Sequence, residues 1–459
     1  MFLNKKRIHF IGIGGSGMNP LAKILIDMGY EVSGSDIKEN VYTLRLKEMG
    51  AQIFYGHDES NIRLAEVVVI SSAIKEDNIE YLMAKSNRMP IYKRAELLSF
   101  IMDKHENRIA VSGTHGKTTT TSFLSHYLQV EDKNPTFVIG APLKHLNTAS
   151  QFGTNEYIVA EADESDRSFL FLNPTVIVIT NIEEEHLDEY EDLQDIIDTF
   201  SRFTDRLPPE KNCLIIHGDD ENIKKINLKN KNVITYGLGE NNIVQARNIR
   251  KKDQKIYFDV YIKGNLVAEN ICLNIPGMQN VLNSLVVFAF AYSHHLSLNN
   301  VTKSFLSFEG ASRRFHKVGE VNEIEIYDDY AHHPTEIKYT LEAAKNFGKR
   351  VVAIFQPHRY SRYNAFYDKF AEVLDIADFV VVTNVYAAGE SNSSNLSINN
   401  MLKLMNKNKT LYIKNIGDIG RTVMEIIKPG DLVITLGAGD ITHVSKEIFQ
   451  QLKAKNIEL

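Results

Sequence analysis

The feature of this sequence that most constrains its fold is a glycine-rich turn that directly follows an apolar run. The segment RIHFIGIGGSGM, residues 7–18, carries the pattern Gly12-x-Gly14-x-x-Gly17, and Asp36 follows about twenty residues later. A strand, a tight glycine turn and a helix in this order belong to parallel α/β sheets, where the helix N-terminus binds a pyrophosphate. The spacing alone therefore predicts NAD, FAD or a nucleotide sugar as the ligand, with Asp36 on a ribose hydroxyl.

Apolar, strand-like runs alternate with helical patterns along most of the 459 residues, which predicts an α/β protein with parallel sheets. A chain of this length is too long for a single hydrophobic core. Three blocks of alternating strands and helices predict three domains, 1–106, 107–311 and 312–459. Between residues 243 and 276 the pattern changes to short alternating runs, which predicts antiparallel strands appended to the second sheet. The third block again predicts a doubly wound sheet.

The composition excludes several classes of protein. Hydrophobic residues make up 43% of the chain and charged residues 24%, as is typical of a globular protein. The net charge of −6 does not favour nucleic acid as a partner. Cys213 and Cys272 form no CxxC pair, and no apolar run approaches the length of a membrane span. We expect a cytoplasmic protein that binds neither nucleic acid nor membrane, as a monomer or a homodimer.

A second glycine-rich turn, VSGTHGKTTTTSF at residues 111–123, lies between an apolar strand and a helical pattern. Four of its residues suit a shortened phosphate loop: Gly113, Gly116, Lys117 and Thr118. Lys117 would neutralise phosphate charge of ATP, and the Thr118 hydroxyl would bind Mg²⁺. The alternative is a Gly/Thr turn with a surface lysine. An ATP site here weakens the NAD interpretation of the first turn, because an oxidoreductase has no general need of one.

Acidic residues gather where the next two predicted strands end. The segment EADESD, residues 161–166, places four carboxylates together, which repel one another unless a cation lies among them. We expect Mg²⁺ there, with Glu161 as the ligand that the strand fixes. After the following strand, TNIEEEH places His186 as a metal ligand or a phosphate contact. Acidic loops and single histidines also occur without a ligand, but the carboxyl ends of parallel strands are where open α/β sheets bind theirs.

Cationic side chains that suit phosphate gather in the third block. The guanidinium fork of arginine matches an oxyanion with two parallel hydrogen bonds. An interdomain salt-bridge network is the alternative for any one of them. The candidates and their neighbours are Arg313, Arg314, Asp328, Asp329, His332, His333, His358, Arg359 and Arg362.

Short motifs follow one another along the chain in the order found in one enzyme family. They are HFIGIGGSGM, SGTHGKTTTT, EADESD, TNIEEEHLD, RRF, DDYAHHPTEI, FQPHRYSR, VYAAGE and TLGAGDI. Together, from residue 8 to residue 441, they resemble the Mur ligase family, and within it the branch that adds L-alanine to UDP-N-acetylmuramate.

The resemblance implies an N-terminal Rossmann-like domain that binds the UDP-sugar, a central P-loop ATPase and a C-terminal Rossmann-like domain that closes on ATP. It implies that ATP, with Mg²⁺ or Mn²⁺, converts the carboxylate of UDP-N-acetylmuramate to an acyl phosphate. The amino group of L-alanine then attacks, and phosphate leaves, in the synthesis of bacterial peptidoglycan. Many relatives carry a carbamoylated lysine between the metals, whereas the matching segment here, DTFSRF, has no lysine, in agreement with the L-alanine branch.

The resemblance also assigns residues to each ligand. The residues for the UDP-sugar are Gly12, Gly14, Gly15, Gly17, Asp36, Ser71 and Ser72. The residues for ATP are Gly113, Thr114, His115, Gly116, Lys117, Thr118, Thr119, Asn280, Asn283, Arg314 and Asp329. The residues around the amino acid are His332, His358, Arg359 and Arg362, and the metal residues are Thr118, Glu161 and His186. Catalytic roles fall to Lys117, Glu161, His186, His332 and Arg359.

Two segments depart from the family pattern. The adenine segment has Gln279 where a histidine is usual, and the polar loop at 390–400 lacks the usual Pro/Gly-rich continuation. Three other functions remain open: a murein tripeptide ligase acting on the same UDP-sugar, an NAD-dependent oxidoreductase, and a nucleotide-binding regulator without catalysis. The regulator would require altered catalytic positions, whereas Lys117, Glu161 and His186 are all present.

Overall fold

The computed structural model describes residues 5–210, 212–228, 231–252, 255–392 and 397–457, so part of the polar loop at 390–400 lies outside the described residues. The chain forms two compact units, each made of several segments. The first unit comprises Met1–Ile182, Ile197–Val244 and Val286–Ser304. The second unit comprises Glu183–Ile196, Gln245–Leu285 and Phe305–Leu459.

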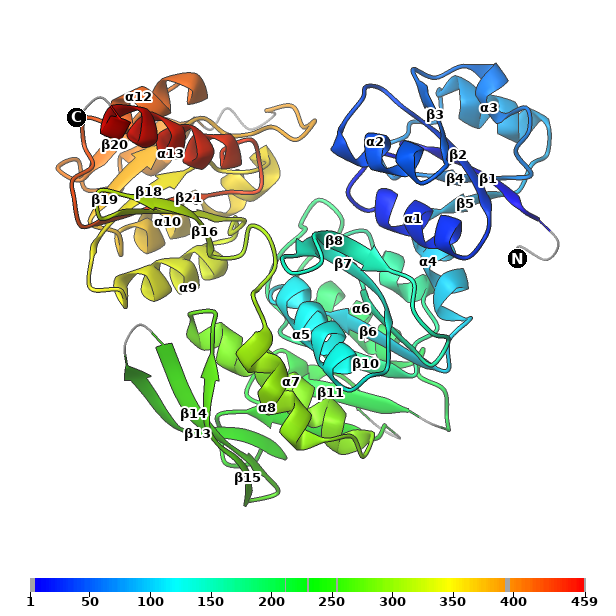
Figure 1. Ribbon diagram of the computed structural model, residues 1–459, viewed down its shortest axis with the longest axis horizontal. Helices are drawn as coiled ribbons and strands as arrows, with labels where there is room; N and C mark the ends of the chain where they lie inside the picture. Colours follow the sequence, from blue (N-terminus) through cyan, green and yellow to red (C-terminus); the bar gives the residue numbers. More distant parts are fainter. Residues whose placement is uncertain (1–4, 211, 229–230, 253–254, 393–396, 458–459) are drawn as a thin grey trace. The chain divides into compact units, whose positions relative to one another are not determined.

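The first unit begins with a parallel sheet of five strands in the order β3-β2-β1-β4-β5 (Figure 1). The direction of winding reverses at β1, so the carboxyl ends of β1 and β4 form a topological switch point, where such sheets bind ligands. The strands are β1 (Arg7–Ile11), β2 (Glu31–Asp36), β3 (Gln52–Tyr55), β4 (Val67–Ile70) and β5 (Ile91–Lys93). The helices are α1 (Asn19–Asp27), α2 (Val41–Glu48), α3 (Ile79–Ser86) and α4 (Arg94–Met102).

Helix α1 follows the first glycine-rich turn, as the sequence predicts. Pro20 lies in its first turn, where the missing N–H costs no hydrogen bond. Leu21, Ile24 and Leu25 are fully buried, and the chain leaves the helix at Gly29 with a φ of +85°.

The central sheet of the first unit places β6 between β9 and β10, and all three strands are parallel. In this unit its order is β12-β11-β10-β6-β9-β7-β8, with β8 antiparallel to β7. Helix α5 begins directly after the second glycine-rich turn and buries Phe123, Leu124, Tyr127 and Leu128. The strands are β6 (Asn107–Ser112), β7 (Thr136–Leu143), β8 (Thr148–Gln151), β9 (Tyr157–Glu161), β10 (Val176–Ile179), β11 (Cys213–His217) and β12 (Val233–Gly237). The helices of this part of the chain are α5 (Lys117–Val130) and α6 (Leu193–Thr204).

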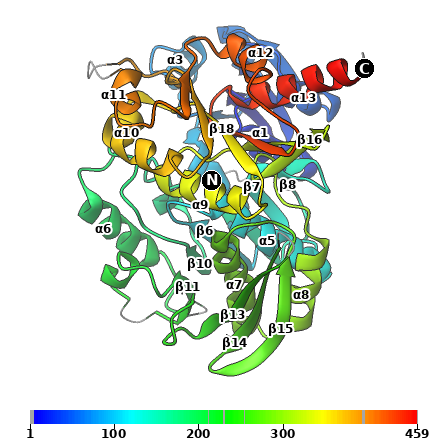
Figure 2. The same ribbon diagram turned by 90° about the vertical axis from the view of Figure 1, so that its left-hand side faces the viewer.

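Strands β14 (Lys255–Ile262) and β15 (Asn265–Leu273) form the antiparallel pair that the alternating runs predict. Figure 2 shows them as a curved ribbon beside β13 (Val244–Lys252). Two helices follow, α7 (Met278–Ser293) and α8 (Leu298–Ser307).

The last sheet, in the second unit, has the order β16-β17-β21-β18-β19-β20, and only β16 is antiparallel to its neighbour. Helices α9, α10 and α11 pack on one face and α12 and α13 on the other, which confirms a doubly wound sheet; Figure 1 shows α9 and α10 on the side opposite α12 and α13. The strands are β16 (His316–Val321), β17 (Ile324–Asp329), β18 (Arg350–Phe355), β19 (Phe379–Val382), β20 (Thr410–Tyr412) and β21 (Asp431–Leu436). The helices are α9 (Pro334–Lys345), α10 (Tyr360–Leu374), α11 (Ile398–Leu402), α12 (Ile419–Val423) and α13 (Thr442–Ile457). Among the residues described, no helix is long and apolar enough to cross a bilayer.

Candidate active site

The first glycine-rich turn continues β1 at the switch point of its sheet. The N–H groups of Gly12 and Ile13 donate to the Ser35 carbonyl at 2.9 and 3.0 Å, which ties the turn to β2. A Cβ added to Gly12, whose φ is +82°, would lie 3.2 Å from the Cβ of Ser71 just after β4. Ser71 therefore lies beside the turn, and the next residue, Ser72, is exposed; their contact with the UDP moiety remains a prediction.

Asp36, the last residue of β2, holds the same turn through its side chain. Its Oδ2 accepts the N–H of Gly14 at 2.8 Å, and a Cβ on Gly14 would lie 2.8 Å from that oxygen. A Cβ on Gly17 would lie 2.9 Å from a side-chain carbon of Arg94, whereas one on Gly15 would meet no atom closer than 3.4 Å. Close packing thus requires glycine at position 14, where a Cβ would also lie 2.5 Å from Asn40 Nδ2, whereas the Arg94 side chain can move away at position 17 and nothing excludes a side chain at position 15.

The second turn lies between β6 and α5, and glycines shape both of its ends. Gly113 has a φ of +127°, and Gly116, the N-cap of α5, has a φ of +85°. Both values lie in the region that side chains disfavour. The turn is therefore a phosphate-loop shape that places Lys117 at the first position of the helix.

Asn181, which follows β10, supports the second turn from the neighbouring strand. Its carbonyl accepts the N–H of Thr114 at 3.1 Å, and its Oδ1 accepts the N–H of His115 at 2.8 Å. Its Nδ2 donates to the His115 carbonyl at 3.0 Å. The sequence interpretation did not identify Asn181 as a site residue. Its position in the dipeptide Thr180-Asn181, directly after a buried strand, could have indicated that it lies at the ligand-binding edge of the sheet.

Lys117 is surrounded by oxygen acceptors. Its Nζ donates to Glu164 Oε1 at 2.6 Å, to the Gly113 carbonyl at 2.6 Å and to the Thr114 carbonyl at 3.2 Å. Burial lowers the pKa of Lys117, but attraction to Glu164 and Asp163 outweighs burial and raises the pKa above its ordinary value. Burial raises the pKa of Glu164 to about 7, against the opposing effect of Lys117. A phosphate that binds here therefore meets a protonated lysine whose position Glu164 fixes.

The expected metal residues lie on both units. Thr118 is buried in the first turn of α5, and Glu161 ends β9, where its Oε1 accepts the N–H of Gly140 at 2.6 Å. A hydroxyl and a carboxylate are hard oxygen donors of the kind that Mg²⁺ prefers. His186 belongs to the second unit, where its φ of +55° and the hydrogen bond from the Tyr190 N–H to its carbonyl set its position.

Arg313 and Arg314 lie before the last sheet. Arg313 Nε donates to Asp328 Oδ2 at 3.2 Å, and Arg314 Nη1 lies 3.7 Å from Glu336 Oε1. Both guanidinium groups lie over the ring of Tyr330, at 5.0 and 5.3 Å from its centre. Both arginines thus belong to one fixed cluster of charges at the carboxyl end of β17.

Asp329, the last residue of β17, organises the backbone around it. Its Oδ2 accepts the N–H of Phe315 at 2.6 Å, and its Oδ1 accepts the N–H of Ala331 at 2.7 Å. Burial raises the pKa of Asp329 to about 6, against the opposing attraction of Arg314. In this structure the carboxylate fixes two loops, and its contact with ATP remains a prediction.

Two histidines expected near the amino acid are neutral at physiological pH. Burial lowers the pKa of His332 to about 3 and that of His358 to about 4. His332 Nδ1 lies 2.9 Å from the Tyr330 carbonyl, which can only accept, so the proton is on Nδ1 and Nε2 is the basic nitrogen. The His358 ring stacks on Tyr386 at 5.5 Å.

Arg362 and Arg359 differ in their surroundings, although the sequence places them in one motif. Arg362 is buried, and its Nε and Nη2 donate to Glu185 Oε1 at 2.8 and 2.6 Å. Arg359 is 39% exposed, with Nη1 at 3.3 Å from Asp188 Oδ2. The buried pair fixes Arg362, whereas Arg359 is the arginine of this motif that is accessible to a ligand.

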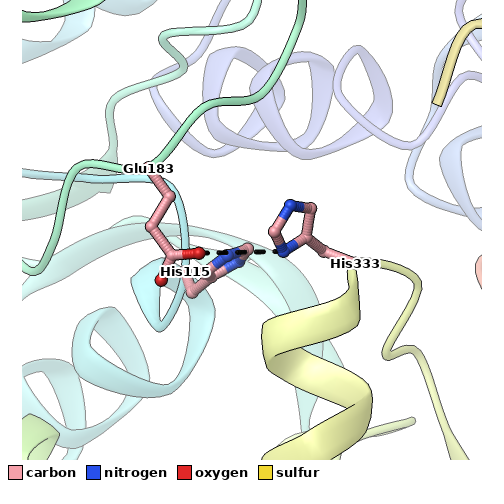
Figure 3. A group of neighbouring side chains, drawn as sticks. All are labelled: His115, Glu183 and His333. Atoms are coloured by element: carbon pink, nitrogen blue, oxygen red, sulfur yellow. Dashed lines mark ion pairs between the residues drawn. The ribbon is translucent and has the colours of Figure 1, made fainter. Parts of the chain in front are cut away.

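The glutamates before His186 were not assigned individual roles from the sequence. Glu185 Oε2 lies 3.4 Å from His333 Nε2, and Glu183 Oε2 accepts from Thr335 Oγ1 at 2.6 Å. Figure 3 shows Glu183 and His333 facing each other, with 4.0 Å between Oε2 and Nδ1. The run of three glutamates beside a histidine was the available signal, and Glu183 and Glu185 are the ones that contact the first turn of α9 and its N-cap residue, His333.

The adenine segment opens α7. Asn280 and Asn283 are buried, and Asn280 Nδ2 donates to the Pro276 carbonyl at 2.6 Å. Gly277 has a φ of +108°, and a Cβ there would lie 2.5 Å from the amide of Gln279. Gln279, which stands where the family usually has a histidine, therefore packs on Gly277 in the turn that begins the helix.

Comparisons with known proteins agree with this arrangement. Residues 7–106 match the model of the Mur ligase family catalytic domain, residues 111–291 that of the Mur ligase middle domain, and residues 313–439 that of the glutamate ligase domain of Mur ligases. The UDP-N-acetylmuramate–L-alanine ligase of a Sulfurihydrogenibium species is 41% identical and covers 99% of this chain and 100% of its own. The chain belongs to the Mur ligase family.

Solved structures extend the comparison to the fold. The UDP-N-acetylmuramate-alanine ligase of Thermotoga maritima has a TM-score of 0.83 and 29% identity, over 98% of this chain and 99% of its own. A murein peptide ligase of Psychrobacter arcticus has a TM-score of 0.74 at 24% identity, over 97% and 98% of the two chains. The three-domain α/β architecture expected from the resemblance is thereby confirmed.

Proposed function

We propose that this Mur ligase joins L-alanine to the carboxylate of UDP-N-acetylmuramate, with ATP as the energy source, in peptidoglycan synthesis. The observation that carries the proposal is the pair of glycine-rich turns on separate sheets, of which only the second holds a lysine. Two nucleotides can then be bound at once, one as part of a substrate and one as phosphoryl donor. The similarity to ligases of this activity over the whole chain supports the choice of substrates.

In this proposal the γ-phosphoryl group of ATP passes to a carboxylate oxygen of the sugar, which gives an acyl phosphate and ADP. Lys117 stabilises the charge of the transferring group, and the N-terminus of α5, which begins at Lys117, faces the other phosphates. The first turn and Asp36 hold the UDP moiety, with Gly12, Gly14, Gly15, Gly17, Ser71 and Ser72 around it.

Thr118, Glu161 and His186 would hold Mg²⁺ or Mn²⁺. The hydroxyl and carboxylate oxygens fit such an ion, and the imidazole nitrogen is better suited to Mn²⁺. When bound, the metal ion would supply positive charge to the phosphate oxygens.

The amino acid would be held by Arg359, which is accessible, and by the neutral imidazoles of His332 and His358. The Nε2 of His332 carries no proton and can accept a hydrogen bond from the attacking amine, which orients it. The buried pair with Glu185 makes Arg362 a positioning residue for His358, whose carbonyl accepts from Arg362 Nη1 at 3.1 Å.

We further propose the domain boundaries 1–106, 107–311 and 312–459 and a cytoplasmic location for this enzyme. Arg314, Asp329, Asn280 and Asn283 would complete the ATP site.

An assay of phosphate release from ATP tests the proposal directly. The full-length protein is incubated with UDP-N-acetylmuramate, ATP, Mg²⁺ and either L-alanine or the tripeptide L-Ala-γ-D-Glu-meso-diaminopimelate. Release that depends on L-alanine is expected, with formation of UDP-N-acetylmuramoyl-L-alanine in equal amount. A strong preference for the tripeptide would identify a murein tripeptide ligase instead. A thermal-shift measurement tests the remaining alternative: a higher melting temperature with NAD but not with UDP-N-acetylmuramate would favour an oxidoreductase.

A further inference from the structure

A buried carboxylate contacts the end of β2, which holds the first glycine-rich turn, and belongs to none of the sites above. Glu80, in the first turn of α3, has no exposed surface. Its Oε2 accepts a hydrogen bond from Ser35 Oγ and lies 3.4 Å from His57 Nδ1 and 3.5 Å from His9 Nε2. No arginine or lysine contacts it among the hydrogen bonds and ion pairs described for this sheet, so it is held by neutral donors and two imidazoles.

The other oxygen of Glu80 holds a second segment. Oε1 accepts Asn61 Nδ2 at 2.6 Å and the N–H of Asp58 at 3.3 Å. Both residues belong to the loop that follows β3, and Gly56 at its start donates its N–H to the Asp36 carbonyl at 2.8 Å. One carboxylate therefore anchors the loop that runs beside the end of β2.

Both anchored segments lead to the residues proposed to bind UDP. The Ser35 carbonyl accepts the N–H groups of Gly12 and Ile13, so the residue that Glu80 holds by its side chain holds the turn by its backbone. Asp36 lies between the two anchored segments, with Ser35 on one side and the Gly56 hydrogen bond on the other. We propose that Glu80 is a positioning residue for nucleotide-sugar binding, which fixes the first glycine-rich turn and Asp36 through Ser35 and the 56–61 loop.

The inference rests on the proposed function, because the ligand of the first turn is assigned there. It predicts that loss of the carboxylate weakens UDP binding without affecting chemistry on the other domains. Burial favours the neutral form of Glu80, but the adjacent His9 and the hydrogen bonds from Ser35 and Asn61 together hold its pKa at about 2, so the group is an anion at working pH. Glu80→Gln keeps its size and one acceptor oxygen but removes that charge.

The experiment measures the dissociation constant of UDP by calorimetry and the steady-state constants for each substrate, in full-length variants. For Glu80→Gln we expect the UDP dissociation constant and the KM for UDP-N-acetylmuramate to rise about tenfold. A displaced turn would lose about one charge-assisted hydrogen bond to the pyrophosphate, which corresponds to that factor. The kcat and the KM for ATP should change less than twofold. Glu48→Gln, an exposed glutamate of α2, is the matched control and should leave every constant unchanged.

Ser35→Ala is the second variant, in case Glu80→Gln fails to fold. It removes only the hydroxyl and should raise the UDP dissociation constant severalfold. In the double variant the two effects should not add, because Glu80 acts on the turn partly through Ser35.

Several results would overturn the inference. A lower melting temperature with unchanged UDP affinity would make Glu80 a purely structural residue. An equal fall in kcat and in affinity for ATP would mean that the effect is not confined to the first turn. Failure of the wild-type protein to bind UDP at all would instead contradict the proposed function, since no variant is involved in that measurement.

Discussion

Both glycine-rich turns are proposed to bind phosphate groups, but different side chains hold them in place. The first turn contains no cation and is held by Ser35 and Asp36 of the adjacent strand β2. The second turn carries Lys117, which is held by Glu164, and it rests on Asn181, which follows the adjacent strand β10. Both turns follow the carboxyl end of a parallel strand and begin a helix.

The difference matches what each phosphate group is proposed to do. A pyrophosphate that stays intact needs only backbone N–H groups and a helix N-terminus. A phosphoryl group that is transferred develops charge on its oxygens, and a fixed lysine stabilises that charge. Substitutions that remove one support at a time therefore test whether the first turn acts in binding and the second in catalysis.

The largest effect is expected from Lys117→Ala. Loss of the charge at the transferring phosphoryl group should lower kcat roughly 10³-fold. The dissociation constant of UDP should remain that of the wild type, because the first turn is unaltered. Phosphate release and calorimetry with UDP measure the two quantities.

Lys133→Ala is the control for this substitution, because Lys133 pairs with Glu156 on the surface of the same unit. It should turn over at the normal rate. Near-normal turnover in Lys117→Ala would show that the lysine takes no part in the mechanism. The proposed distinction between a binding role for the first turn and a catalytic role for the second would then be wrong.

The next largest effect is a dependence of the stability of the first sheet on acidic pH. Hydrogen bonds and the adjacent His9 lower the folded-state pKa of Glu80 to about 2, so its stabilising contribution is complete above the unfolded pKa near 4.5 and is lost as pH falls through 2. The linkage amounts to about 3 kcal/mol at most. Glu80→Gln should therefore lose less stability than the wild type between pH 5 and pH 3.

Hydrogen exchange of β1 and β2 measures this locally, since the opening free energy of each amide reports its own sheet. Glu48→Gln should follow the wild-type curve. The idea is wrong if Glu80→Gln and the wild type lose the same opening free energy over this range.

A smaller effect separates two glycines of the first turn. Gly14→Ala places a Cβ 2.8 Å from Asp36 Oδ2, so it should lower the melting temperature and raise the KM for UDP-N-acetylmuramate about tenfold. Gly15→Ala meets no such obstacle and should keep the wild-type melting temperature. If Gly15→Ala nevertheless raises the KM, then glycine is needed there for close approach of the ligand, as expected for a pyrophosphate.

The sequence predicted the elements that carry a local signal. The strands that end at the two turns, the helices that follow them and the antiparallel pair at β14 and β15 are where hydrophobic periodicity and glycines indicated them. The candidate residues at strand ends, such as Glu161 and Asp329, also lie where the alternation of strands places them.

The supports of the site could not be predicted in the same way. Glu80 and Asn181 are distant in sequence from the turns they support, and their roles depend on which strands become neighbours. Short strands such as β5 and β20 carry too few residues for a periodic signal. Nor can a motif distinguish the buried Arg362 from the accessible Arg359, because pairing with Glu185 requires a loop far away in the chain.

The smallest effect is expected from Asn181→Ala. The substitution removes two hydrogen bonds between the Asn181 side chain and the backbone of His115, and it keeps the bond from the Thr114 N–H to the Asn181 carbonyl. A net loss of about 1 kcal/mol should raise the KM for ATP roughly fivefold and leave UDP affinity unchanged. Asn155→Ala, an exposed asparagine of the same unit, should change neither constant. An unchanged KM for ATP in Asn181→Ala would show that the second turn does not need the Asn181 side chain, and that Thr180, whose Oγ1 also donates to the His115 carbonyl, supports it sufficiently.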